Sequence, residues 1–159
     1  MPLAKREPLA GLIAQALESG GPRWVTSRGA CHGELLPDGA RILLEPFGKR
    51  PPQQGEIAAY LSPQGREVVH RLCHSDARGW WGNTDTALAM ERTGRLIGRV
   101  TACRHDGRVR GVKPLAARAA LAWFIHRLYR RTHGRFGAGG RLVFELVRRL
   151  KPRLYPHTA

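Results

Sequence analysis

The chain has 159 residues and a formal net charge of +15, which is enough for one packed domain but not for a second core of its own. The charge is uneven, because residues 104–159 hold fourteen Lys or Arg against only Asp106 and Glu145. Twelve of the fifteen net positive charges therefore fall in this C-terminal part. Such a basic segment predicts an anionic partner.

The cysteine count and the hydropathy argue against several protein classes. Three cysteines are an odd number, and the N-terminal residues lack the apolar core and cleavage site of a secretory signal. We therefore expect free thiols in a reducing compartment and no disulfide framework. No apolar run approaches the ~20 residues that span a bilayer. These features predict a cytoplasmic protein, peripheral to a membrane at most.

The predicted elements begin with a short amphipathic helix over residues 8–18, opened by Pro8 and closed by Gly20. From residue 23 the pattern changes to short apolar runs bounded by Gly, Pro, Asp or Asn, which is typical of strands. These runs are RWVTS (23–27), ARILLEP (40–46), GEIAAYLS (55–62), REVVHRLCH (66–74) and GRLIGRVTA (94–102). Residues 1–112 are thus predicted to form a mainly β domain with an N-terminal helix.

Residues 113–159 are predicted to form a basic extension of amphipathic helices. Ala119, Ala122 and Ile125 recur at helical spacing after Pro114, and the glycine-rich stretch 133–140 then interrupts the pattern. A last apolar stripe follows at Leu142, Val143, Leu146, Val147 and Leu150. Two roles stay open for this extension: helices that cover the β domain with solvated arginines, or a docking element.

Cysteines and histidines that could carry chemistry lie in a few short stretches. A metal site is one alternative, with seven candidate ligands: Cys31, His32, His70, Cys73, His74, Cys103 and His105. Their spacing lacks the paired ligands of structural zinc sites, so we expect no metal. On a strand, His70 and Cys73 point to opposite faces unless a bulge intervenes. We expect Cys73 and Cys103 to be buried in strands, and His74 and His105 to lie exposed at strand ends.

Cys31 stands in a different context, the glycine-rich turn SRGACHGELLPDGA (27–40) before a strand. The stretch resembles the nucleophile box of signal peptidase I and LexA-type serine peptidases, where a Gly-x-Ser-Met turn precedes a Gly-Asp that starts a strand. Aligned on Leu36 and Gly39, Cys31 occupies the position of the serine. Three later stretches resemble the family's motifs in the same order: QQGEIAAYLSPQGREVVHRLC (53–73), WWGNTDT (80–86) and RLIGRVTAC (95–103). The resemblance covers about residues 8–110.

This resemblance implies a LexA- or signal-peptidase-like β fold and a peptidase without a cofactor. Cys31 would be the nucleophile, His70 the general base, and Asp85 the carboxylate that orients the base, with Asp76 as the alternative carboxylate. A histidine base suits a thiol, because imidazolium stabilises thiolate. Departures from the family pattern, such as Ala40 after the glycine, leave an inactive peptide-binding relative as the alternative.

The expected partner is a peptide substrate, and the resemblance to short soluble members of the family suggests a leader peptide by analogy. The basic extension could dock an acidic peptide or, through its arginines with Trp123 and Phe124, an anionic membrane surface. Nucleic acid is not favoured, because no base-stacking β surface or reading helix accompanies the charge.

Overall fold

The computed structural model describes residues 17, 19–29, 32–85, 87–132, 145–147 and 149. The predicted helix over residues 8–18 and the apolar stripe over residues 142–150 therefore lie almost wholly outside the described residues. Ala30 and Cys31 lie outside them as well.

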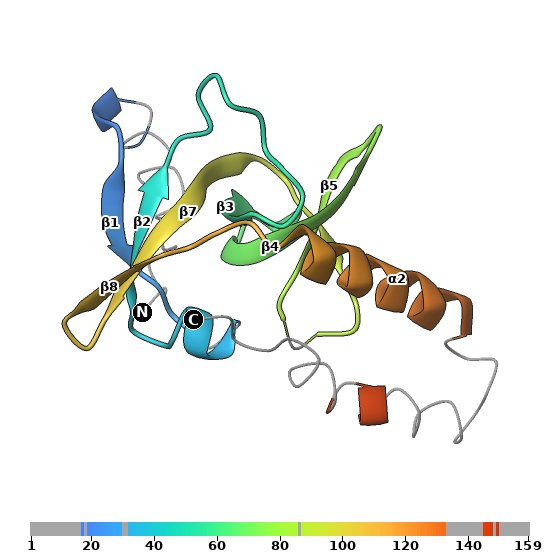
Figure 1. The fold of residues 1–159 in the computed structure, drawn as a ribbon. Coiled ribbons are helices and arrows are strands. Elements are labelled where there is room, and N and C mark those ends of the chain that lie inside the picture. The colour runs from blue at the N-terminus through green and yellow to red at the C-terminus, as the bar shows by residue number, and fades with distance from the viewer. Residues whose placement is uncertain are drawn as a thin grey trace, which may run out of the picture.

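The described chain is mainly β, with eight strands in one antiparallel sheet followed by a long helix (Figure 1). The strands are β1 (Arg23–Thr26), β2 (Arg41–Glu45), β3 (Ile57–Leu61), β4 (Glu67–Asp76), β5 (Gly79–Asn83), β6 (Glu91–Arg92), β7 (Leu96–His105) and β8 (Arg108–Gly111). The helix α2 spans Ala116–Thr132, and a 3-10 helix, η1, spans Gly33–Leu35. The strand order is β1-β2-β7-β3-β4-β5-β6, and β8 also pairs with β7.

All five strands expected from the apolar runs are present, as β1, β2, β3, β4 and β7. The other three strands were not predicted, because none of them carries an alternating apolar pattern. β5 places two tryptophans before a glycine, β6 has only two residues, and β8 is exposed throughout. These strands are held in place by pairing with their neighbours in the sheet and not by burial of an apolar face of their own.

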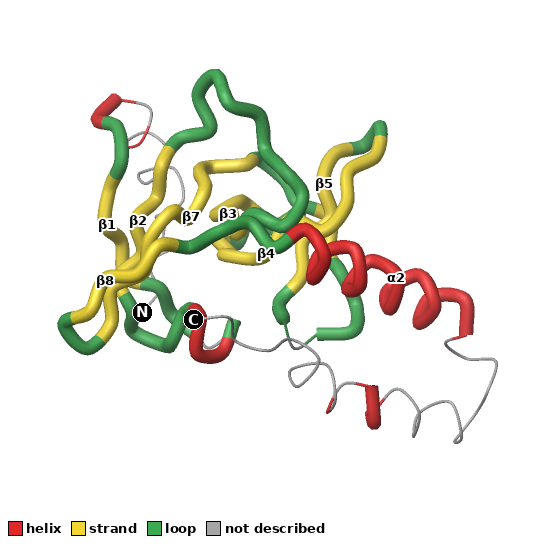
Figure 2. The backbone as a smooth tube through the Cα atoms, viewed as in Figure 1, coloured by secondary structure: helices red, strands yellow, loops and turns green. Residues whose placement is uncertain are grey.

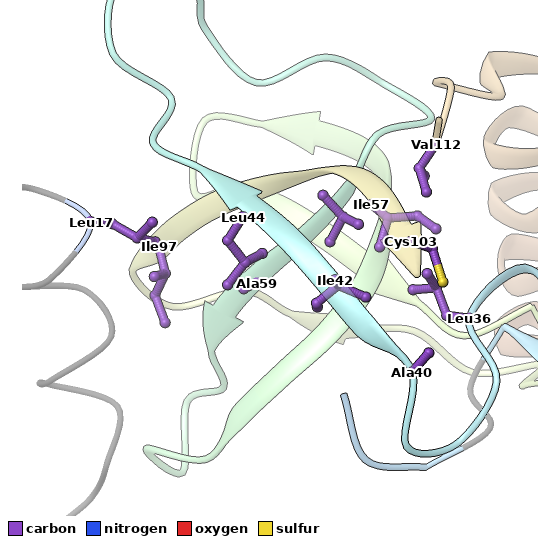
Figure 3. Close-up of a cluster of buried hydrophobic side chains, with 11 residues drawn as sticks. Leu17, Leu36, Ala40, Ile42, Leu44, Ile57, Ala59, Ile97, Cys103 and Val112 are labelled. Carbon is purple, nitrogen blue, oxygen red and sulfur yellow. The ribbon is translucent and has the colours of Figure 1, made fainter. Parts of the chain in front are cut away.

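The main core lies on β2, β7 and β3, which are neighbours in the sheet (Figure 3). Its members are Leu17, Leu36, Ala40, Ile42, Leu44, Ile57, Ala59, Ile97, Val100, Cys103 and Val112. The pairing register shifts between Leu43 and Leu44 of β2, and again between Ala59 and Tyr60 of β3, in both cases against β7. Such bulges increase the local twist of a sheet. The twisted sheet can therefore enclose its apolar side chains without a second sheet.

β4 has a bulge of its own, between Leu72 and His74, where it pairs with β5. Cys73 is the extra residue, and its side chain packs with Met90, Ala119 and Ala122. His70 and Cys73 therefore serve different parts of the molecule: His70 contacts residues of the sheet, whereas Cys73 packs against α2.

The helix α2 covers the part of the sheet that contains β4 and β5 (Figure 1). Ala119, Ala122 and Ile125 are buried, as the helical spacing predicted. Trp123 stacks on His74 of β4 with ring centroids 4.1 Å apart. Residues 116–132 thus behave as the covering-helix alternative describes, because they pack directly on the sheet.

The structure also tests the predicted burial of two cysteines and the predicted exposure of two histidines. Cys73 and Cys103 are buried, as expected. His105 lies at the end of β7 and is partly exposed, also as expected. The prediction for His74 was wrong, because His74 lies inside β4, where Trp123 covers its ring.

Among the described residues, no helix combines the length and the apolar character that crossing a membrane requires.

The start of α2 rests on Gly55, in the loop that joins β2 to β3 (Figure 2). Gly55 has a φ of +92°, its carbonyl accepts a hydrogen bond from Leu115 N, and an added Cβ would lie 2.5 Å from Ala116 N. Gly55→Ala should therefore cost about 1–2 kcal/mol of backbone strain and about 1–3 kcal/mol of overpacking. Gly65→Ala is the control, because Gly65 has a φ of +74° and open space around it. Urea unfolding of both variants measures the difference, and equal losses would contradict this packing.

Candidate active site

The turn that carries Cys31 is closed at its base and held on both sides. Ser27 N donates to Ala40 O, and Gly39 N donates to Ser27 O, so the two ends of the segment meet. Gly29 N donates to Asp38 Oδ1 over 2.6 Å. Gly29, Gly33 and Gly39 all have positive φ, which explains why glycine recurs in this stretch. The chain on either side of residues 30–31 is therefore fixed relative to the sheet.

His32 anchors the far side of this turn to β4. Its side chain is buried, and its Nε2 lies 3.2 Å from Val69 O. Its Nδ1 lies 3.1 Å from Asp85 Oδ2, at ion-pair distance but without a well-directed hydrogen bond. Both ring nitrogens face oxygen acceptors, and only the doubly protonated ring can donate from both. The surroundings of His32 therefore suit a positioning residue better than a base.

Asp85 links His32 to a buried arginine. Arg71 Nε and Nη2 donate to the two oxygens of Asp85 over 3.0 and 3.1 Å, and Arg71 Nη1 donates to Gly55 O. Burial alone would raise the pKa of the Asp85 carboxyl, but the contacts with His32 and Arg71 outweigh it and hold the pKa well below its usual range. Asp85 is therefore an ionised structural carboxylate that contacts both His32 and Arg71.

His70 has a separate set of partners. Its Nδ1 lies 3.1 Å from Glu91 Oε1 and 3.0 Å from Tyr60 Oη, and the Tyr60 hydroxyl donates to Glu91 Oε1 over 2.9 Å. Within the described residues, Nε2 of His70 makes no hydrogen bond. A proton on Nδ1 satisfies the carboxylate and leaves the lone pair on Nε2, which is the arrangement of a general base.

The pKa of His70 is lowered from its ordinary value. Burial is the main cause, the charge on His32 contributes in the same direction, and Glu91 partly opposes both. The two histidine rings are 6.4 Å apart. His70 is therefore neutral at pH 7, which a base must be before it can accept a proton.

The expected grouping of Cys31, His70 and Asp85 differs from the one observed. Glu91, not Asp85, contacts His70, whereas Asp85 contacts His32 and Arg71. The alternative carboxylate, Asp76, lies on the β4–β5 hairpin and bonds to Arg92 and the Trp81 indole. Cys31 lies outside the described residues, but its neighbour His32 is held near His70.

The metal alternative finds no support in the described part of the chain. No group of three or more His, Cys, Asp or Glu side chains there has the arrangement that could hold a metal ion. Cys73 packs under α2 and Cys103 in the main core, so neither thiol faces the histidine pair.

Tyr60 and Glu91 are two of the site residues that sequence reasoning missed. Tyr60 lies on β3 opposite Val68 of β4, which places it diagonally beside His70. Glu91 reaches the site from β6, where it pairs with Gly82. A Cβ on Gly82 would lie 2.2 Å from Tyr60 Oη, so this glycine leaves room for the hydroxyl. Gly82 in the stretch WWGN is a sequence feature that could have indicated this contact. Its meaning is clear only when the register of the strands is known.

Comparisons with known proteins identify no relative: no family model, curated protein or solved structure matches the chain. The likeness to signal peptidase I and LexA-type peptidases therefore rests on short motifs alone and stays a prediction. Function has to be argued from the chemistry of the site.

The contact between Glu91 and His70 predicts a measurable pKa change. Glu91→Gln removes the charge that favours imidazolium, so the titration midpoint of His70 should fall by about 1 pH unit. Side-chain NMR of the histidine ring during a pH titration measures it. Glu45→Gln is the matched control, because Glu45 is bonded to Thr101 and not to a histidine. An unchanged or higher midpoint in Glu91→Gln would show that the carboxylate does not act on His70.

Proposed function

We propose that this protein is a peptidase in which Cys31 is the nucleophile and His70 the general base. The observation that carries the proposal is the environment of His70: a carboxylate and a tyrosine hydroxyl lie at Nδ1, and no described residue bonds to Nε2. The position of Cys31 supports it, because Cys31 directly precedes His32, whose ring lies 6.4 Å from that of His70.

The proposed reaction has two halves. In the first, Nε2 of His70 takes the proton of the Cys31 thiol, and the thiolate attacks the carbonyl carbon of the scissile peptide bond. The C–N bond breaks as His70 returns the proton to the leaving amine, which leaves a thioester on Cys31. In the second half, His70 takes a proton from water, and the resulting hydroxide attacks the thioester. The C–S bond breaks as His70 returns this proton to the sulfur, which releases the new carboxyl terminus and restores the thiol.

Glu91 and Tyr60 serve this chemistry through His70. Glu91 accepts a hydrogen bond from the Nδ1–H of His70, so the tautomer with a basic Nε2 is favoured, and its negative charge stabilises the imidazolium that forms during attack. Tyr60 donates to Glu91 and keeps the carboxylate beside the ring. We assign Glu91 the orienting role that the family resemblance suggested for Asp85.

The group of His32, Asp85 and Arg71 holds the nucleophile's turn in place in this proposal. The substrate class is a peptide, and a leader peptide is the form favoured by the resemblance to short members of the peptidase family. The alternative function is peptide binding without cleavage, and cleavage assays distinguish it from peptidase activity.

The first test removes each reacting group in turn. Cys31→Ala and His70→Ala should each lower the cleavage rate of leader peptides encoded by neighbouring genes by at least ~100-fold, because the pair acts as a unit. Cys31→Ser should keep part of the activity. His105→Ala is the control, since His105 is partly exposed at the end of β7. A wild type that binds such peptides but cleaves none, with the same affinity in Cys31→Ala, would overturn the enzyme assignment.

The second test separates the two carboxylates. Glu91→Gln should lower kcat by about 100-fold or more and leave the free energy of unfolding nearly unchanged, because Glu91 is only partly buried. Asp85→Asn should instead cost about 3–5 kcal/mol of stability at pH 7, because Arg71 keeps its charge without a counter-ion. Enzyme assays and urea unfolding measure the two effects. A stable but inactive Asp85→Asn beside an active Glu91→Gln would return the orienting role to Asp85.

The pH dependence follows from the lowered pKa of Asp85. An unfolded aspartate titrates near 3.9, so the ion pair stabilises the protein fully above about pH 4 and loses its effect as the pH falls through the lower folded pKa. The stability difference between wild type and Asp85→Asn should therefore shrink between pH 4 and pH 2. A difference that does not depend on pH would contradict the ion pair.

A further inference from the structure

A second concave feature lies away from the histidine pair, between the β4–β5 turn and α2. It is a pocket of about 480 Å³, within the size range that holds small ligands. Arg78 contributes from the turn, and Arg127, Arg130 and Arg131 contribute from α2. We call this feature the arginine pocket. It shares none of its lining residues with the histidine site.

The arginine pocket has an excess of positive charge. The neighbouring carboxylate, Asp76, is already engaged by both terminal nitrogens of Arg92 over 2.6 Å. Within the described residues, no carboxylate pairs with Arg78, Arg127, Arg130 or Arg131. Guanidinium groups bind phosphate and carboxylate oxygens in a forked geometry. The pocket is thus suited to a ligand that carries such anionic oxygens.

The aromatic floor of the pocket does not offer a free stacking surface. Trp81 has the guanidinium of Arg92 4.0 Å from its ring centroid, and Trp123 stacks on His74. Trp123 also stacks with His126, with ring centroids 5.6 Å apart. Nucleic-acid sites of the single-strand type rely on exposed rings on which bases stack. The pocket therefore favours an anionic group without a base.

The outer face of α2 beside the pocket is apolar and uncovered by any described residue. Phe124 is 64% exposed and Leu128 is 47% exposed, and at four residues apart they lie on one face of the helix. Arg127 and Arg131 lie next to this pair on the same helix surface. An exposed aromatic and an exposed leucine beside arginines form the pattern of a helix that lies in a membrane interface.

We propose that α2 and the arginine pocket bind an anionic membrane surface, with the phosphate of an acidic lipid headgroup in the pocket and Phe124 and Leu128 in the interface beside it. The arginines supply the attraction to the negative surface, and the two apolar side chains supply burial that salt does not screen. The proposal stands on α2 and the hairpin alone and does not depend on the peptidase assignment.

The test is sedimentation of the full chain with vesicles of phosphatidylcholine, with and without phosphatidylglycerol. The wild type should bind the phosphatidylglycerol vesicles. Arg127→Gln with Arg130→Gln should weaken that binding by about twenty-five-fold, because each arginine near an anionic surface contributes about fivefold. Arg41→Gln with Arg108→Gln is the matched control, because it removes the same charge from β2 and β8, far from α2 in Figure 1. The control should lose less than about threefold, since distant charges are screened.

Phe124→Ser distinguishes the membrane from a soluble anion. It should reduce vesicle binding at 0.5 M salt, where the apolar contribution remains, and leave the thermal unfolding midpoint unchanged. Equal losses in the two arginine pairs would mean that net charge alone drives binding and would overturn the pocket. Phe124→Ser without effect, together with full competition by pyrophosphate or by single-stranded DNA, would assign the pocket to a soluble polyanion and overturn the membrane.

Discussion

The candidate active site depends on one buried cation, Arg71. Its side chain is 1% exposed, and it donates to both oxygens of Asp85 and to the carbonyl of Gly55. A charge at this depth is tolerated only where its hydrogen bonds are satisfied, and removing one partner is far more costly than removing an exposed ion pair. Arg71 therefore ties three segments together: β4, the turn after β5, and the loop against which α2 begins.

Three consecutive residues of β4 each contact a different part of the site. Val69 offers its carbonyl to His32, His70 faces Glu91 and Tyr60, and Arg71 binds Asp85. The two histidines consequently occupy different environments although their rings are close together. His32 lies between acceptors and fixes the turn that precedes it, whereas one nitrogen of His70 has no hydrogen-bond partner in the described part of the chain. This difference is why we assign the positioning role to one and the basic role to the other.

The main strands could be predicted from the sequence, but the pairing of the carboxylates could not. Apolar runs mark β2, β3, β4 and β7, because each of these strands has buried positions in the sheet. Arginine is normally exposed, so nothing in the run HRLC indicated that Arg71 would be buried and would form an ion pair with Asp85. Glu91 lies in a strand of two residues, and its distance to His70 follows from the register of β5 and β6, which no local pattern encodes.

The alkylation rate of each thiol measures whether His70 activates Cys31, as we propose. Iodoacetamide labelling at pH 7, mapped by mass spectrometry, should modify Cys31 well before the buried Cys73 and Cys103 in the wild type. In His70→Ala the rate at Cys31 should fall by about tenfold or more, because the imidazolium that stabilises its thiolate is lost. Labelling of Cys31 at the same rate in both proteins would contradict the account, as would faster labelling of Cys73 than of Cys31.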